Sequence, residues 1–365
     1  LLHHQRIILH LDLDYFYAQV EEARNPEIKN KSVVICQYSG RSEDSGAVAT
    51  TNYIARKFNV KSGLPIKTAK NLLQNTDSVF ISANHELYES ISESIMNVMR
   101  KYSDTFEQLS IDEACIDISN KMNNDYQSAT VYGNKLQHEI KTSENLTCSV
   151  GIGPNKLIAK MAADSNKPNG TTVITPENVE DFLFPQAVNK LYGIGPKTQS
   201  KLAEYKIRTI KELANSKREL LIDEFGQKFG VYLHDSAHGI DNEPVKDKPA
   251  DQIGRIVTLK EDSKDIDTIS KSLIDLSKDL FDQTQEKKIT FKTVSISAIM
   301  EDLTICQRSK SFEIFQNSNE IIADTSQELL KTFLLQEPRK LRRIGVRVSN
   351  FSQTNGQTNL FDFNI

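Results

Sequence analysis

Alternating apolar and polar positions predict a strand at the start of the chain. Over residues 7–14 the apolar side chains occupy every second position and face one way, so Asp12 and Asp14 share the opposite face. An aromatic cluster, Tyr15 to Tyr17, follows at once and opens a helix that runs toward Glu22. The pattern therefore places two carboxylates on one face of a strand, near its end.

Strands and helices alternate up to about residue 172. We expect strands over 31–37 and 146–152, helices over 52–58, 84–102, 129–142 and 155–164, and a hairpin around Asp112 and Glu113. With residues 17–83 set aside as an insertion, the order is strand, helix, two strands, helix, strand, which is the split βαβ arrangement. In that topology the first strand lies beside the hairpin, so Asp12 can meet Asp112 and Glu113.

The segment after residue 172 is more helical and ends in a polar stretch. Residues 191–198 contain Gly193 and Gly195 and are typical of a hairpin between helices, whose backbone N–H groups suit a DNA phosphate. An ordinary helix-helix turn is an equal alternative. Residues 241–252 are polar, contain two prolines and are the best linker candidate.

Beyond this linker the order of strands and helices repeats. We expect strands over 253–259, 291–300, 303–311 and 341–349, and helices over 266–282 and 319–335. Because its central positions carry no acidic residues, this second split βαβ domain is expected to bind rather than to catalyse. On its last strand Arg343 and Arg347 face away from the apolar side, beside Arg342. An arginine stripe on an open sheet suits a duplex backbone better than it suits a merely solvated face.

Composition narrows the class of protein. The 365 residues predict two to four domains. Hydrophobic residues make up 38%, and no apolar run approaches the ~20 residues that span a bilayer, so we expect a soluble protein with no membrane partner. No secretory signal is visible, and residues 1–5, which lack an initiator methionine, are left out of the fold prediction.

The cysteines and the net charge add two further expectations. The four cysteines lie far apart without a C-x-x-C pair, which argues against a zinc site or a disulfide framework and fits the reduced cytoplasm. A net charge of -4 does not indicate a nucleic-acid partner, so any DNA-binding groups must be gathered locally.

The acidic hairpin is the strongest candidate for chemistry. Two carboxylates about 4 Å apart repel by roughly 4 kcal/mol at an effective dielectric near 20, so a divalent cation is their natural partner. Taken alone, Asp112 and Glu113 are more simply explained as a solvated turn. Their convergence with Asp12 on one sheet changes this interpretation, because three carboxylates together strongly favour a metal. Asp117 is expected to have a structural role.

The combined motifs resemble those of the Y-family translesion DNA polymerases, in the archaeal form of the DinB-type (DNA polymerase IV) branch. The resemblance runs from Ile7 to about Ser352. Its carriers are the runs 12–21, 46–57, 110–114, 149–152, 162–170 and 254–258. Three positions depart from the family pattern: Leu13 replaces a frequent aromatic residue, Cys115 a common tyrosine and Tyr192 a common proline. None of these changes removes a metal ligand.

The resemblance implies an α+β right-hand polymerase. It assigns residues 1–16 and 84–174 to a ferredoxin-like palm, 17–83 to small fingers, 175–240 to a helical thumb with a helix-hairpin-helix, 241–252 to a linker, 253–350 to a βαββαβ little finger, and 351–365 to a tail. The tail is rich in Asn, Gln, Thr and Ser and is expected to be disordered, with a docking peptide at its end.

The resemblance also implies roles for individual residues. Two Mg²⁺ ions would be bound by Asp12, Asp112, Glu113 and the main-chain carbonyl of Leu13. Nucleotide contacts would come from Tyr17 as a steric gate against the 2′-hydroxyl, with Phe16, Tyr53, Arg56 and Lys167. Contacts to the nascent pair would come from Gly46, Ala47 and Ala49, and contacts to DNA from Gly193, Gly195, Lys197, Arg255, Arg342, Arg343 and Arg347. Clamp contacts would come from Gln357, Leu360, Phe361 and Phe363. For the nucleotide-binding side chains the alternative is an ordinary surface residue, and for Tyr17 it is a core aromatic residue.

The expected function is low-fidelity, template-directed DNA synthesis past lesions by a cytoplasmic monomer. Its partners would be primer–template DNA, deoxynucleotides and a sliding clamp, of the PCNA type or, in bacteria, the β clamp. A non-catalytic DNA-binding clamp adaptor is the alternative, although an intact acidic triad is costly to keep without a metal. A nucleotide cyclase with an acidic palm would need neither a thumb nor a clamp peptide.

Overall fold

The computed structural model describes residues 6–123, 125–247 and 249–353. The chain divides into two compact units, the first comprising Leu1–Gln37 and Ala47–Lys248, and the second Tyr38–Gly46 and Pro249–Ile365. Among the described residues, no helix combines the length and the apolar character that crossing a membrane would require.

A five-stranded sheet forms the centre of the first unit. Its order is β5-β6-β1-β7-β8, with β1 antiparallel to both neighbours. The bounds are Ile8–Leu13 (β1), Thr105–Gln108 (β5), Glu113–Asp117 (β6), Cys148–Gly153 (β7) and Thr171–Val173 (β8). The predicted split βαβ arrangement is therefore confirmed, and β1 lies beside the acidic hairpin.

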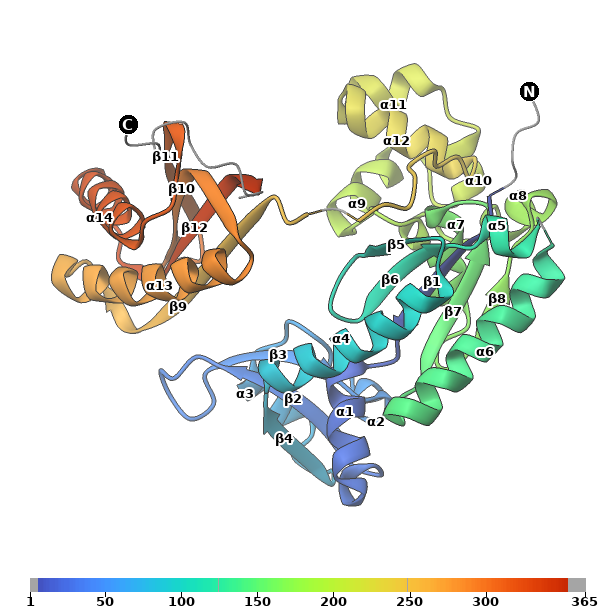
Figure 1. Cartoon of the computed structure of the whole chain (residues 1–365), viewed down its shortest axis with the longest axis horizontal. Helices are drawn as coiled ribbons and strands as arrows, with labels where there is room; N and C mark the ends of the chain where they lie inside the picture. The colour runs from blue at the N-terminus through green and yellow to red at the C-terminus, as the bar shows by residue number, and fades with distance from the viewer. Residues whose placement is uncertain (1–5, 124, 248, 354–365) are drawn as a thin grey trace, which may run out of the picture. The chain divides into compact units, whose positions relative to one another are not determined.

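Helices cover both faces of this sheet (Figure 1). On one face, α4 (His85–Tyr102) and α6 (Tyr126–Glu144) pack against the odd-numbered side chains of β1, such as Leu9 and Leu11, which are fully buried. On the other face lies α7 (Lys156–Ser165). The alternation of β1 thus separates an apolar core from the face that carries Asp12.

A smaller sheet and short helices make up the region between β1 and α4. The sheet order is β3-β2-β4, and β2 and β4 are parallel. The elements are α1 (Phe16–Arg24), η1 (Pro26–Ile28), β2 (Ser32–Tyr38), β3 (Gly46–Thr51), α2 (Tyr53–Arg56), α3 (Ile66–Leu72) and β4 (Ser78–Ser82). The helix predicted over 52–58 is one turn long: Asn52 caps it, and Asn59 adopts a left-handed φ of 61° that ends the helical path.

The helical end of the first unit has its own apolar core, with Leu202, Leu213 and Leu233 fully buried. Its elements are η2 (Pro176–Asn178), α8 (Val179–Leu183), η3 (Val188–Lys190), α9 (Pro196–Glu204), α10 (Ile210–Ala214), α11 (Arg218–Phe225) and α12 (Gln227–Ala237). A further short helix, α5 (Ser119–Met122), directly precedes α6. Thr209 and Glu212 form a capping box at the start of α10, which satisfies backbone donors that the helix itself cannot.

The second unit is a four-stranded antiparallel sheet with two helices packed on one face. The elements are β9 (Gln252–Ser263), α13 (Ile266–Glu286), β10 (Ile289–Met300), β11 (Ile305–Gln316), α14 (Asn319–Gln336) and β12 (Leu341–Gln353). The sheet order is β11-β10-β12-β9. The order of elements along the chain matches that of the first sheet, but here the first strand lies at the edge instead of in the centre.

The described part of the predicted linker packs against the first unit. Arg6 donates hydrogen bonds to the carbonyl oxygens of Asp241 and Glu243, at 2.6 and 2.9 Å. Val245 is buried together with Ile8 of β1, Cys115 of β6 and Ala159 of α7. Residues 241–247 are therefore held by specific contacts despite their polar composition.

Candidate active site

The register of the central sheet brings Asp12 and Glu113 together. Asp12 at the end of β1 pairs directly with Glu113 at the start of β6. Because paired residues of neighbouring strands point to the same face, both carboxylates lie on one side of the sheet. One ligand atom from each, together with one from His10, falls within 4.8 Å of the others.

Asp112 lies at the same turn but outside this group. Its carbonyl oxygen accepts the N–H of Leu13 at 2.8 Å, and its carboxylate accepts the Ser110 hydroxyl at 2.5 Å. Ser110 also accepts the backbone N–H groups of Asp112 and Glu113. The turn is therefore ordered by its own hydrogen bonds, and the role of Asp112 as a metal ligand stays a prediction.

Glu113 is held as a carboxylate by two basic groups. Lys160 of α7 donates to Oε2 of Glu113, and Nε2 of His10 lies 3.3 Å from the same oxygen without making a well-aligned hydrogen bond. Burial by itself would raise the pKa of Glu113, but His10 and Lys160 outweigh it and lower the pKa to about 2. Glu113 is thus ionised at neutral pH.

Asp12 is paired with Lys167. The ammonium lies 2.6 Å from Oδ2 of Asp12 and 2.7 Å from Oδ1 of Asp164. Burial raises the pKa of Asp12, and the attraction of Lys167 opposes that shift only in part. The structure therefore brings a predicted triphosphate-binding lysine into contact with a predicted metal ligand.

This donor set fits a hard divalent cation. Carboxylate oxygens are the ligands that Mg²⁺ and Mn²⁺ prefer, and Asp12 and Glu113 present them on one face. The buried Nε2 of His10 has no hydrogen-bond partner among the described residues, and Lys160 forms an ion pair with Glu113.

The aromatic residues after β1 divide between core and site. Phe16 is 2% exposed and its ring belongs to the core, so the nucleotide contact predicted for it would come from its main chain and stays a prediction. Tyr17 is half-buried and stacks on Tyr88 with ring centroids 4.2 Å apart. Burial and the nearby Asp112 raise the pKa of Tyr17, so it is a neutral phenol close to the acidic turn.

Tyr53 and Arg56 lie together on α2. The guanidinium carbon of Arg56 is 4.8 Å from the centroid of the Tyr53 ring, and Arg56 donates to the carbonyl oxygen of Thr51. Burial, with the charges of Asp14 and Asp12, raises the pKa of Tyr53, and the positive charges of Arg56 and Lys167 oppose this shift. The structure thus places Tyr53 within electrostatic range of the carboxylate site. On the neighbouring β3, the predicted nascent-pair residues are partly exposed; these are Gly46, Ala47 and Ala49.

Asp14 is buried and accepts three hydrogen bonds. The donors are the hydroxyl groups of Thr147 and Ser149, at 2.8 and 2.7 Å, and the N–H of Asn169, at 2.9 Å. It therefore ties β1 to β7 and to the loop that carries Lys167. Asp117 accepts the backbone N–H of Ser119 at 2.9 Å, a structural contact of the kind expected.

The glycine hairpin lies between η3 and α9. Gly193 adopts a φ of +86°, which a side chain would strain, and the hydroxyl of Tyr232 donates to the carbonyl oxygen of Tyr192 at 2.6 Å. Gly195 precedes the first turn of α9, and Lys197 lies within that turn. DNA contacts here stay a prediction.

In the second unit the arginine stripe lies as the alternation predicts. Ile344, Val346 and Val348 are buried, whereas Arg343 and Arg347 are opposite Thr258 and Gly254 and remain partly exposed. Arg255 is opposite Val346 and so belongs to the other face, but as part of an edge strand it is exposed. Arg342 lies 3.9 Å from Asp262.

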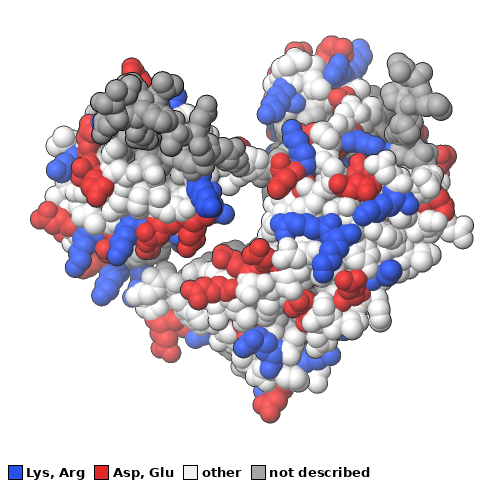
Figure 2. Space-filling view, in the orientation of Figure 1, with Lys and Arg blue, Asp and Glu red and all other residues white. Residues whose placement is uncertain are grey.

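A shallow hollow of about 320 Å³ lies beside this stripe, and its lining includes Arg255, Arg347, Gly254, Ser297 and Gly345. Elsewhere basic and acidic side chains are interspersed on the visible face, in keeping with the net charge (Figure 2). The predicted clamp peptide, Gln357 to Phe363, lies outside the described residues.

Two residues of the site, His10 and Lys160, were not found from the sequence. His10 stands two positions before Asp12, so the alternation of β1 already placed it on the same face. Lys156, Lys160 and Asp164 recur every four residues on an otherwise apolar helix, a spacing that aligns them. Both signals were present, but only the paired sheet shows that His10 and Lys160 converge on Glu113.

The fold and its central carboxylates define a right-hand polymerase. A model of the impB/mucB/samB family matches residues 11–164, and a model of that family's C-terminal domain matches residues 250–360. Between them, a model described as "DNA polymerase-iota, thumb domain" matches residues 189–241. We therefore call this helical region the thumb.

Individual relatives match nearly the whole chain. The DNA polymerase IV of Methanosarcina acetivorans is 43% identical over 98% of this chain and 100% of its own length, and that of Nitrosopumilus maritimus is 40% identical over 98% and 99%. The Y-family DNA polymerase chimera Dbh-Dpo4(243-245)-Dbh superposes with a TM-score of 0.90 at 35% identity, covering 95% of this chain and 100% of that chain. The insertion ternary complex of Dbh DNA polymerase gives 0.72 at 34% identity, with the same coverage. The chain belongs to the Y family of DNA polymerases and is a DNA-directed DNA polymerase of the metal-dependent kind.

Proposed function

We propose that the active site lies where β1 meets β6, and that Asp12, Asp112, Glu113 and the main-chain carbonyl of Leu13 hold two Mg²⁺ ions there. The protein is a low-fidelity, template-directed polymerase of the translesion class. The observation that carries the proposal is the direct pairing of Asp12 with Glu113 on one face of the sheet. When bound, two such ions lower the pKa of a primer 3′-hydroxyl, hold the triphosphate and neutralise charge on the pyrophosphate that leaves.

The protein's own side chains would position the nucleotide. Tyr53, Arg56 and Lys167 supply a phenol, a guanidinium and an ammonium, which are suitable donors to phosphoryl oxygens. Support comes from Lys167, which already contacts Asp12, and from Tyr53, which lies within electrostatic range of Lys167. Lys167 is therefore poised to move between the carboxylate and a triphosphate.

Selection of the sugar is proposed to depend on Tyr17, and tolerance of damaged bases on the small residues of β3. The stack on Tyr88 fixes the Tyr17 ring near Asp112, where a 2′-hydroxyl would collide with it. Gly46, Ala47 and Ala49 leave a loosely filled surface over the nascent pair. A loose pocket discriminates poorly among bases, and the same looseness admits lesions.

DNA is proposed to bind along the glycine hairpin and the arginine stripe. Gly193, Gly195 and Lys197 would contact the backbone from the thumb, and Arg255, Arg342, Arg343 and Arg347 from the second unit. The terminal peptide would bind a sliding clamp, of the PCNA type or the β type. We further propose that the protein acts as a monomer in the cytoplasm, where its DNA substrate would be copied.

The alternative, a non-catalytic clamp adaptor with a vestigial site, gains no support. The relatives named above are DNA polymerases by name, and both carboxylates are held in ordered positions by basic groups.

A primer-extension assay with Asp112→Asn tests the active site. We expect the variant to lose nucleotide incorporation while it still binds primer–template DNA. Asp117→Asn is the matched control: it makes the same replacement at the far end of β6, at a residue that contacts Ser119. Substantial incorporation by Asp112→Asn would remove Asp112 from the metal site.

A further inference from the structure

Lys160 is a largely buried cation on α7, whose neighbouring residues are apolar. Its neighbours Ile158, Ala159 and Met161 are buried, and the Lys160 side chain is only 15% exposed. Lysine is rarely this buried unless it is paired, because removing an ammonium from water is costly. Such a residue needs a specific explanation.

Its ionic partner is Glu113. Lys160 donates to Oε2, and His10 approaches the same oxygen. Both contacts use Oε2 of Glu113. No hydrogen bond or ion pair among the described residues uses Oε1, so Oε1 is the oxygen that can bind a cation. An anchored oxygen fixes the rotation of the carboxylate, and residues that orient a metal ligand in this way typically change metal affinity 10- to 100-fold when they are removed.

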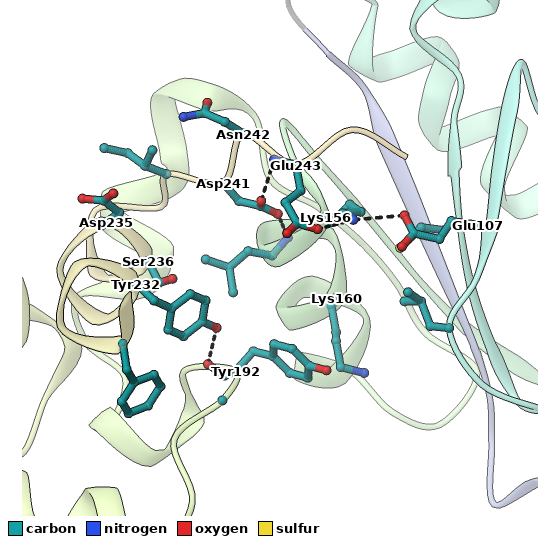
Figure 3. Close-up of a pocket in the computed structure, with 16 residues that line it drawn as sticks. Glu107, Lys156, Lys160, Tyr192, Tyr232, Asp235, Ser236, Asp241, Asn242 and Glu243 are labelled. Carbon is teal, nitrogen blue, oxygen red and sulfur yellow. Dashed lines mark hydrogen bonds and ion pairs between the residues drawn. The ribbon is translucent and has the colours of Figure 1, made fainter. Parts of the chain in front are cut away.

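The same ammonium also faces the thumb. It lies 5.4 Å from the centroid of the Tyr192 ring, within the range of a cation–π contact. Tyr192 directly precedes Gly193, and its carbonyl oxygen is held by Tyr232 of α12. Figure 3 shows Lys160 and Tyr192 side by side on the wall of a cavity of about 590 Å³. Lys160 therefore has room to follow a shift of the hairpin.

We propose that Lys160 is a positioning residue that orients Glu113 for its metal ion and couples that orientation to the thumb hairpin through Tyr192. The inference rests on the proposed active site and extends it to the thumb. Displacement of the hairpin changes the environment of Lys160, and Lys160 transmits that change to the carboxylate.

Metal affinity measured without turnover tests this role. Mn²⁺ is titrated into the complex of protein and dideoxy-terminated primer–template, and the free ion is followed by electron paramagnetic resonance. We expect Lys160→Met to bind Mn²⁺ about tenfold more weakly and Lys160→Arg to restore most of the affinity. An unchanged affinity would overturn the proposal. A tighter affinity would overturn it too, because Lys160 would then only compete with the ion.

Two controls separate positioning from folding and from DNA binding. Lys156→Met removes a lysine one turn earlier that pairs with Glu107 and Glu243, and it should leave Mn²⁺ affinity unchanged. Thermal unfolding checks that each variant is folded. DNA affinity without metal should be equal in wild type and Lys160→Met; a loss of DNA affinity with normal Mn²⁺ affinity would make Lys160 a DNA contact and refute the proposal.

The thumb connection is tested by a double-mutant cycle. Tyr192→Leu should weaken Mn²⁺ binding about threefold when Lys160 is present and have no effect in Lys160→Met, whereas Tyr192→Phe, which keeps the ring, should behave as wild type. Additive effects would remove the coupling. If wild type fails to extend primers with any divalent cation, the proposed function fails; if wild type extends primers but Lys160→Met binds Mn²⁺ normally, only this inference fails.

Discussion

Asp14 gives the sharpest test of how the site is held together. Asp14 is 1% exposed, and its carboxylate accepts hydrogen bonds from Thr147, Ser149 and Asn169. Asn169 lies two residues after Lys167, so the same carboxylate fixes the loop that carries this lysine. Replacing Asp14 should therefore affect both stability and nucleotide binding.

The size of the effect follows from the three bonds. Hydrogen bonds to a charged group contribute about 1.5–3 kcal/mol each, and the two hydroxyls can turn to other partners, so Asp14→Ala should cost about 3–5 kcal/mol. Asp14→Asn keeps one acceptor and should cost about half as much. At about 2–4 °C per kcal/mol for a domain of this size, the unfolding midpoint should fall by roughly 10 °C in Asp14→Ala and roughly 5 °C in Asp14→Asn.

Calorimetry and steady-state kinetics measure the two effects. We expect the KM for deoxynucleotides to rise about tenfold in Asp14→Ala, because Lys167 loses its fixed loop. Asp125→Ala is the control: Asp125 also accepts bonds from Gln127 and Ser128, but it is an exposed helix cap remote from Lys167 in the chain. It should lower the midpoint less and leave KM unchanged. An Asp14→Ala midpoint within about 2 °C of wild type would refute the reasoning.

Three further predictions follow from the site. The folded-state pKa of Glu113, about 2, lies below its ordinary value of 4.5. The ionised Glu113 therefore stabilises the folded state by up to about 3 kcal/mol. This stabilisation is complete above pH 4.5 and is lost as the pH falls toward 2. The gap in unfolding midpoint between wild type and Glu113→Gln should therefore shrink from pH 7 to pH 3, and a constant gap would contradict the pairing with Lys160. Tyr17→Ala should raise the ratio of ribo- to deoxyribonucleotide incorporation, and an unaltered ratio would exclude Tyr17 as the gate. Deleting residues 357–363 should abolish stimulation by a clamp but not unassisted synthesis, and stimulation that persists would place the clamp contact elsewhere.

Periodicity predicted much of the fold because most strands have one apolar face. The alternation of β1 placed Asp12 opposite the core, and the split βαβ order placed it beside β6. The strand order of the second unit could not be obtained in this way, because the same order of elements is compatible with a first strand in the centre or at the edge. Only the pairing of β12 with both β10 and β9 decides between them.

The parts of the site that sequence reasoning missed depend on contacts between distant residues. Lys160 belongs to the site because it contacts Glu113, which lies on another element. Val245 stands among polar residues in the sequence, yet its side chain packs against Ile8. Phe16 shows a related limit of the sequence pattern: its ring fills the core, so its predicted nucleotide contact would have to come from main-chain atoms and stays a prediction.

In the proposed role of Tyr17 as the sugar gate, its stack on Tyr88 would make the stiffness of this ring pair part of sugar selection. Tyr88 is fully buried and its hydroxyl donates to Glu21 at 2.7 Å, so the ring on which Tyr17 stacks is held in place. A rigid ring pair would exclude a 2′-hydroxyl by steric overlap, and the resulting selectivity between deoxyribose and ribose should vary little with temperature. A polymerase that accepts bulkier sugars could therefore be engineered without touching Tyr17, by loosening Tyr88 or Glu21 behind it.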